Sequence, residues 1–162
     1  MKKQKAPAES DRKQKKFYQH VVVFSVGRRR FALPVSAVVE VFDLSSLPIK
    51  VPGVSDWMGG IINHHGQVLP LIQMNMLLGV ESRNDTGQVL LVELFGDRLG
   101  ILVDQIESLE EVEIEESEDK QKVESYLYHG EKLEKLDLGS LQKSIRSRIN
   151  AGRHQFVTAA ST

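Results

Sequence analysis

The chain contains no cysteine among its 162 residues, and only 6% of the residues are aromatic. The lack of cysteine excludes a disulfide framework, a thiolate metal site and a cysteine nucleophile. The 21 basic residues nearly balance the 22 acidic ones, so the formal net charge is -1. No overall field therefore attracts nucleic acid or an anionic lipid surface. No apolar run approaches the roughly 20 residues of a transmembrane helix, and we expect no direct membrane insertion.

Enough apolar residues remain for a real core, because 41% of the chain is hydrophobic. Its length suits one domain or two small lobes that share a core. Residues 1–16 carry seven basic side chains and almost no hydrophobes, which predicts a disordered basic arm. We expect the folded domain to span residues 17–149, and residues 150–162 to form a flexible C-terminal tail.

Short apolar runs separated by turn signals dominate the middle of the chain and predict β-structure. A polar turn centred on Gly66 indicates a hairpin, and Gly96-Asp97 indicates another. Residues 35–42 are ambiguous between a helical turn and a strand. The expected strands span residues 20–27, 29–33, 89–95, 98–103, 107–114 and 131–138.

Only one long segment has a persuasive helical pattern. Leu138, Leu141, Ile145 and Ile149 recur at spacings of three and four, which aligns them on one helical face. Ser140 is the expected N-cap and Gly152 the expected stop, while Asn75 could cap a single earlier turn. The pattern as a whole predicts a mainly β protein with a short C-terminal helix. Its buried residues should include Val22, Phe24, Ile62, Leu69, Leu71, Leu91, Ile101, Val103 and Ile145.

The sequence offers no convincing catalytic or metal-binding motif. Gly59-Gly60 lacks the later glycine and lysine of a phosphate-binding loop and better suits a tight turn or a close backbone approach. His64 and His65 are neighbours, and neighbouring side chains on a strand point to opposite faces, so they should not share one metal ion. The acidic run 113–119 lacks the alternation and central glycine of a calcium loop. We therefore expect no enzyme activity, no catalytic residue, no metal and no cofactor.

The order of the elements resembles a CheW-like domain. The strongest resemblance lies in residues 58–72, where a glycine and apolar pair precede Asn63-His64-His65-Gly66 and a strand with an internal proline. Residues 100–104, Gly-Ile-Leu-Val-Asp followed by Ile106, are similar to a second segment of that family. The resemblance implies two SH3-like β-barrel lobes around a shared core, with a helix at the C-terminus.

The same resemblance implies a non-catalytic chemotaxis adaptor in the cytoplasm, recruited to membrane-associated receptor arrays. It would couple the regulatory domain of a CheA-type histidine kinase to the cytoplasmic tips of chemoreceptors, without nucleic acid as a partner. The alternative is a CheW-like scaffold of another signalling pathway that binds only one of these partners. By resemblance, the kinase contacts are Pro48, Ile49, Val51 and Val54. The receptor contacts, in a groove between the lobes, are Val38, Glu40, Asn63, His65 and Gly66.

Two departures from the family pattern bear on the receptor contacts. His65 stands where the family turn has an arginine, and Gln73 replaces an aspartate after the proline-containing strand. In the family that arginine can pair with the acid at position 40. The sequence allows an ion pair between Glu40 and His65, strongest when the histidine is protonated, or alternatively an unpaired surface histidine at position 65.

Overall fold

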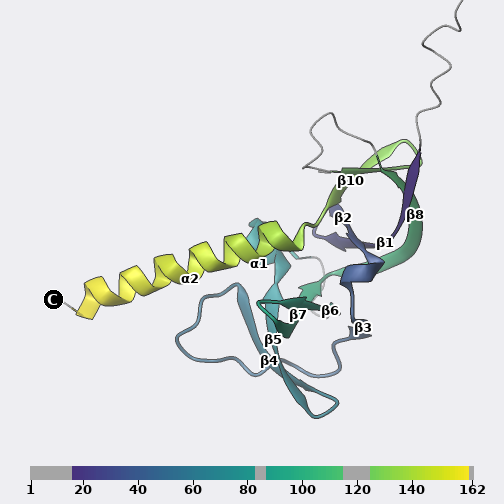
Figure 1. Ribbon diagram of the computed structural model, residues 1–162. Helices are drawn as coiled ribbons and strands as arrows, with labels where there is room; N and C mark the ends of the chain where they lie inside the picture. Colours follow the sequence, from purple (N-terminus) through teal and green to yellow (C-terminus); the bar gives the residue numbers. More distant parts are fainter. Residues whose placement is uncertain (1–15, 83–86, 115–124, 161–162) are drawn as a thin grey trace, which may run out of the picture.

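A computed structural model of the chain describes residues 16–82, 87–114 and 125–160, with side chains through residue 152. Residues 1–15 of the expected basic arm and residues 115–124 of the acidic segment lie outside the described residues. Within the described part, the chain forms two β lobes and a long C-terminal helix (Figure 1). The expected mainly β fold, with two barrel-like lobes and a C-terminal helix, is confirmed.

The first lobe, here the barrel lobe, is a closed barrel with the strand order β1-β2-β10-β9-β8. A parallel pairing of β10 with β2 and an antiparallel pairing of β1 with β8 complete the ring. Every strand of this lobe therefore has hydrogen-bonded neighbours on both sides. Its strands are β1 (Phe17–Val26), β2 (Arg29–Pro34), β8 (Gln105–Ile114), β9 (Ser125–Tyr128) and β10 (Glu131–Lys135).

The second lobe, here the sheet lobe, is a five-stranded sheet with the order β3-β6-β7-β5-β4. Its strands are β3 (Glu40–Asp43), β4 (Met58–His64), β5 (Gln67–Gln73), β6 (Gln88–Leu94) and β7 (Asp97–Val103). The ambiguous segment before β3 begins as a 3₁₀ turn, Val35–Ala37, and becomes a strand at Glu40. The short helix α1 (Met74–Leu78) follows β5 and ends at Gly79, whose left-handed backbone (φ 66°) suits a glycine cap.

Strands that are apolar on both faces connect the two lobes. Along β1, Val21 and Val23 point into the barrel lobe, whereas the alternate residues Val22 and Phe24 point toward the sheet lobe. Strand β6 does the same, with one face in the core of its own lobe and the other in the shared core. A strand buried on both faces should read as a continuous apolar run, and both do.

Three apolar clusters result, one inside each lobe and a larger one between them. The shared cluster includes Phe24, Trp57, Ile101 and Ile145, so it receives residues from both lobes and from the C-terminal helix. All nine residues that were predicted to be buried are less than 9% exposed, which confirms that prediction.

Asp104 lies at the joint where β7 of the sheet lobe passes into β8 of the barrel lobe. Its buried carboxylate accepts hydrogen bonds from the Gly27 amide (2.7 Å) and the Ser82 hydroxyl (2.6 Å). Its own amide donates to the carbonyl oxygen of Ser25 (3.0 Å). One residue thus connects the turn after β1 to the crossover between the lobes.

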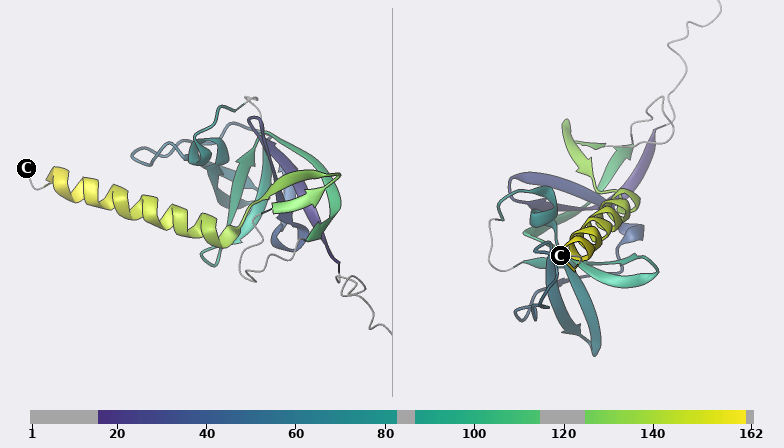
Figure 2. Two further views of the ribbon diagram at one scale, coloured as in Figure 1. Left: turned by 90° about the horizontal axis from the view of Figure 1, so that it is seen from above. Right: turned by 90° about the vertical axis from the view of Figure 1, so that its left-hand side faces the viewer.

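The C-terminal helix α2 (Leu138–Ala160) differs from the prediction at both ends. Asp137, not Ser140, is the N-cap, because its carboxylate accepts hydrogen bonds from the amides of Gly139 and Ser140. The helix also continues past Gly152, so most of the segment expected to be a flexible tail is helical. Only the start of α2 packs on the lobes, and the rest projects away from them (Figures 1 and 2).

Other parts of the prediction also differ from the structure. The turn between β6 and β7 is Phe95-Gly96, one residue earlier than expected, with φ angles of 57° and 78°. Strand β9 was not predicted, because it has only four residues. It nevertheless contributes Tyr126, one of the largest fully buried side chains.

Candidate functional site

The most exposed aliphatic cluster lies on the segment between β3 and β4, residues 44–57, which we call the apolar loop. Leu47 is 87% exposed, Ile49 68%, Val51 38% and Val54 37%. The predicted kinase contacts Ile49, Val51 and Val54 all lie exposed on this loop, and Pro48 is half-buried. Leu47 was missed, although its position between a serine and a proline already argued against a strand or helix interior.

Backbone pairing holds the apolar loop against β4. Ile49 and Ile61 form an isolated antiparallel bridge, in which each amide donates to the other's carbonyl oxygen at 2.9 Å. Gly60 makes this approach possible, because a Cβ atom at that position would overlap the carbonyl oxygen of Ile49. The sequence allowed either a tight turn or a close backbone approach at Gly59-Gly60, and the structure shows the close approach at Gly60. The loop backbone is thus held against β4 at Ile49, while the aliphatic side chains of the loop are exposed.

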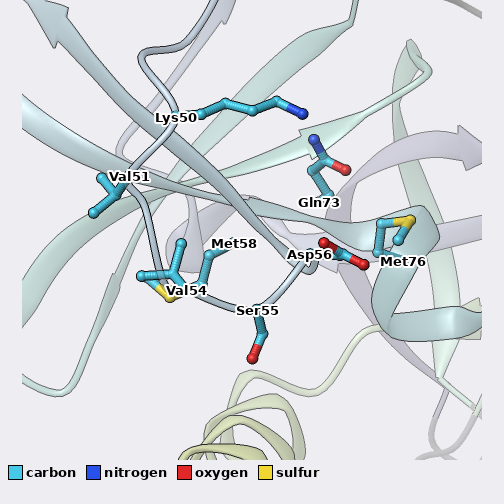
Figure 3. Close-up of a pocket in the computed structure, with 8 residues that line it drawn as sticks. All are labelled: Lys50, Val51, Val54, Ser55, Asp56, Met58, Gln73 and Met76. Carbon is cyan, nitrogen blue, oxygen red and sulfur yellow. The ribbon is translucent and has the colours of Figure 1, made fainter.

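A pocket of about 310 Å³ opens beside this loop (Figure 3). Lys50 and Gln73 point toward one another on one side of it, and Val54 and Met58 lie together on another. Gln73, the residue that departs from the family pattern, therefore contributes to this recess. The complete lining is Lys50, Val51, Val54, Ser55, Asp56, Met58, Gln73 and Met76.

A second polar feature lies where β3 and the end of β4 meet, and we call Glu40, His64 and His65 the Glu-His corner. His64 Nε2 lies 3.1 Å from Glu40 Oε2, so the acid pairs with His64 and the predicted Glu40–His65 pair is wrong. The His64 ring stacks on Phe42, with centroids 3.8 Å apart and planes 9° from parallel. The His65 ring meets the His64 ring edge-on, with centroids 4.2 Å apart.

The turn geometry explains why the two histidines converge. His65 has a left-handed backbone (φ 51°) and precedes Gly66 (φ 81°), so His65 is outside the regular alternation of the strand. The Asn63 side chain fixes this turn, because its Oδ1 accepts the Gly66 amide at 2.9 Å. The prediction that His64 and His65 must point to opposite faces is therefore wrong. One ligand atom from each of Glu40, His64 and His65 lies within 4.8 Å of the other two.

The remaining predicted receptor contacts divide into two groups. Glu40, Asn63, His65 and Gly66 are exposed at or beside the Glu-His corner. Val38 is half-buried and packs against the shared core instead. Sequence reasoning missed Phe42 and His64, whose contact depends on the two ends of the sheet curling toward each other. No local sequence signal indicates that curl.

Comparison with known proteins identifies a family with this two-lobe architecture. The CheW-like domain family matches residues 20–129, which is more than half of the chain. The chain belongs to this family, whose members are non-catalytic scaffolds in chemotaxis signalling. None of the helices in the described residues is both long and apolar enough to cross a membrane.

Two known proteins resemble this chain, one in sequence and one in structure. Protein PilI of Pseudomonas aeruginosa is 32% identical over 85 residues, 51% of this chain and 47% of that protein. The match thus spans about half the length of that relative. The crystal structure of the scaffolding protein TtCheW from Thermoanaerobacter tengcongensis superposes with a TM-score of 0.65 at 21% identity, covering 75% of this chain and 90% of that one. This second likeness concerns the fold.

Proposed function

We propose that this protein couples a CheA-type histidine kinase to the cytoplasmic tips of chemoreceptors, within receptor arrays at the membrane. The observation that carries the proposal is the apolar loop. Four aliphatic side chains, Leu47, Ile49, Val51 and Val54, are more than a third exposed on a segment whose backbone pairs with β4 at Ile49. Contiguous exposed apolar groups of this kind mark protein interfaces. Family membership supports a scaffold role for such an interface.

The two surfaces of the sheet lobe suit two different partners. The apolar loop and its pocket offer aliphatic contacts, which we assign to the regulatory domain of the kinase. The corner formed by Glu40 and His65, with the turn Asn63–Gly66 beside it, is polar, and we assign it to the receptor tip. Because the surfaces consist of different residues, one adaptor could hold both partners together.

Charge substitution on the apolar loop tests the kinase assignment. Leu47→Glu and Val54→Glu should each weaken binding to the kinase regulatory domain by about tenfold or more, which corresponds to about 1.4 kcal/mol. Their thermal melting should match the parent, because both side chains are solvent-exposed. Leu109→Glu is the matched control, since Leu109 is 71% exposed on the barrel lobe. Unchanged kinase binding by the loop variants, or equal weakening by Leu109→Glu, would refute the assignment.

Co-sedimentation with receptor fragments tests the second surface. Glu40→Ala should reduce the fraction that sediments with receptor while leaving kinase binding unchanged. The similarity to protein PilI supports a second candidate, a scaffold of another chemosensory pathway. In this candidate the scaffold would bind only one of the two partners. That candidate predicts retention by receptor alone or by kinase alone, whereas the coupling adaptor joins both in one sedimenting complex.

A further inference from the structure

The Glu-His corner combines three potential metal ligands, two from consecutive histidines at the end of β4 and one from the start of β3. Glu40 begins β3, His64 ends β4, and His65 occupies the turn after it. Their ligand atoms lie within 4.8 Å of one another. We propose that Glu40, His64 and His65 form a binding site for one divalent transition-metal ion, with Zn²⁺ as the first candidate.

The chemistry of the donors favours such an ion over a hard cation. Two imidazole nitrogens and one carboxylate oxygen are ligands that Zn²⁺ accepts, whereas Ca²⁺ and Mg²⁺ require oxygen ligands. Three protein ligands leave the fourth position of a tetrahedral ion open to water or to a partner's side chain.

The distances suit a tetrahedral ion. For Zn–N and Zn–O distances of about 2.0–2.1 Å, two donors at a tetrahedral angle lie about 3.3 Å apart. The observed distance between His64 Nε2 and Glu40 Oε2 is 3.1 Å. This pair therefore needs little movement to accept an ion. His65 is exposed, so its imidazole can turn toward the same point without displacing core residues.

The surroundings fix the His64 ring and the backbone turn that carries His65 before any ion binds. Phe42 stacks on the His64 ring at 3.8 Å and fixes its plane. The Asn63–Gly66 hydrogen bond fixes the turn that carries His65. Preorganisation of this kind lowers the cost of ordering flexible side chains on binding.

A second hairpin provides a built-in control. The turn after β9 also places a histidine and a glycine, His129 (φ 47°) and Gly130 (φ 79°), after an aromatic residue. The His129 ring meets Tyr128 edge-on at 4.2 Å, much as the His65 ring meets His64. The two turns share their local geometry, but His129 belongs to no three-ligand cluster among the described residues.

Calorimetric titration of the full chain with ZnCl₂ tests the proposal. We expect saturable one-to-one binding by the parent and by His129→Ala. Affinity should fall by about tenfold or more in Glu40→Gln and in His65→Ala, since each removes one ligand. Excess MgCl₂ or CaCl₂ should not lower the measured affinity for Zn²⁺. Thermal melts without metal check that the variants fold, and Zn²⁺ should raise the melting temperature of the parent but not of His65→Ala.

Two results would overturn the site. One is equal Zn²⁺ affinity in the parent, Glu40→Gln and His65→Ala, which would indicate adventitious binding by scattered histidines. The other is an unchanged nitrogen resonance of His64 Nε2 at saturating Zn²⁺ in an imidazole NMR experiment. Neither measurement involves a kinase or receptor, so the metal site and the proposed adaptor function can fail independently.

Discussion

Each lobe has five strands, but the strands form a closed ring in one lobe and an open order in the other. The barrel lobe closes through backbone pairing, and ion pairs such as Arg29–Glu134 (2.8 Å) and Arg30–Glu107 (2.7 Å) lie across its surface. In the sheet lobe, the end strands β3 and β4 are not paired, and contact between them depends on the side chains of Glu40, Phe42 and His64. The barrel lobe thus pairs every strand edge, whereas the sheet lobe leaves β3 and β4 unpaired with each other and carries the exposed side chains of the apolar loop beside β4.

The largest expected loss of stability tests whether the two lobes unfold together or separately. Ile101 is fully buried in the shared cluster, so Ile101→Ala should lower the free energy of unfolding by about 2–5 kcal/mol. Because the cluster joins both lobes, urea unfolding followed by Trp57 fluorescence and by circular dichroism should remain a single, coincident transition. Ile49→Ala is the control, with an expected change within about 0.5 kcal/mol at an exposed site. Two separate transitions, only one of them shifted, would show that the lobes unfold independently.

A smaller effect is expected at the joint. Asp104→Ala removes the acceptor of the Gly27 amide and of the Ser82 hydroxyl, and an unsatisfied buried donor costs about 1–3 kcal/mol. Chemical denaturation should therefore show a loss of this size. Asp97→Ala, at an exposed carboxylate of the adjoining strand, should be nearly neutral. Equal stability of the two variants would mean that Asp104 does not secure the joint.

The cap of α2 should contribute less still. Asp137→Ala should cost about 0.5–2 kcal/mol, measured by thermal or urea unfolding. The hydrogen bond from the Ser140 hydroxyl (2.7 Å), followed by the Ser140 and Gly139 amides, lowers the pKa of Asp137. A lowered pKa in the folded state stabilises the fold above the unfolded-state value of about 3.9, and this contribution is lost as pH falls through the folded-state value. The stability difference between parent and variant should therefore shrink in acid, and a constant difference would exclude the charged cap.

The smallest expected effect tests the ion pairs of the barrel lobe. Glu134→Gln removes the charge that Arg29 contacts, but both side chains are more than 40% exposed. Exposed pairs contribute about 0.2–1 kcal/mol, so the loss should be slight and should vanish in high salt. A loss comparable to that of Ile101→Ala would mean that charges rather than backbone pairing hold the barrel closed.

Much of the fold could be predicted because local patterns and tertiary structure agree. The apolar run around Val22 and Phe24, the glycine turn at Gly66 and the spacing of four between Leu141 and Ile145 all correspond to observed elements. Helix ends were harder to predict. Asp137 and Ser140 are both good capping residues, and Gly152 costs a helix only about 1 kcal/mol, so the sequence allowed several boundaries.

The Glu-His corner could be predicted only in part. Glu40 and His65 were selected correctly as neighbours of one surface, but His64 was expected to point away. Strand alternation applies to extended backbone, and it fails at a residue with a φ of 51°. The contact between Glu40 and His64 also requires the curl of the sheet, which arises from packing over the whole lobe.

The order of the strands along the chain also affects how the protein emerges from the ribosome. Strands β3 to β7 are inserted between β2 and β8, so the barrel lobe begins before the sheet lobe and is completed after it. Gly27 and its acceptor Asp104 are 77 residues apart. At about 5–20 residues per second, translation needs about 4–15 s to cover that distance. During that interval β1 exists without β8, and the inserted lobe is synthesised before the lobe that surrounds it in sequence can close.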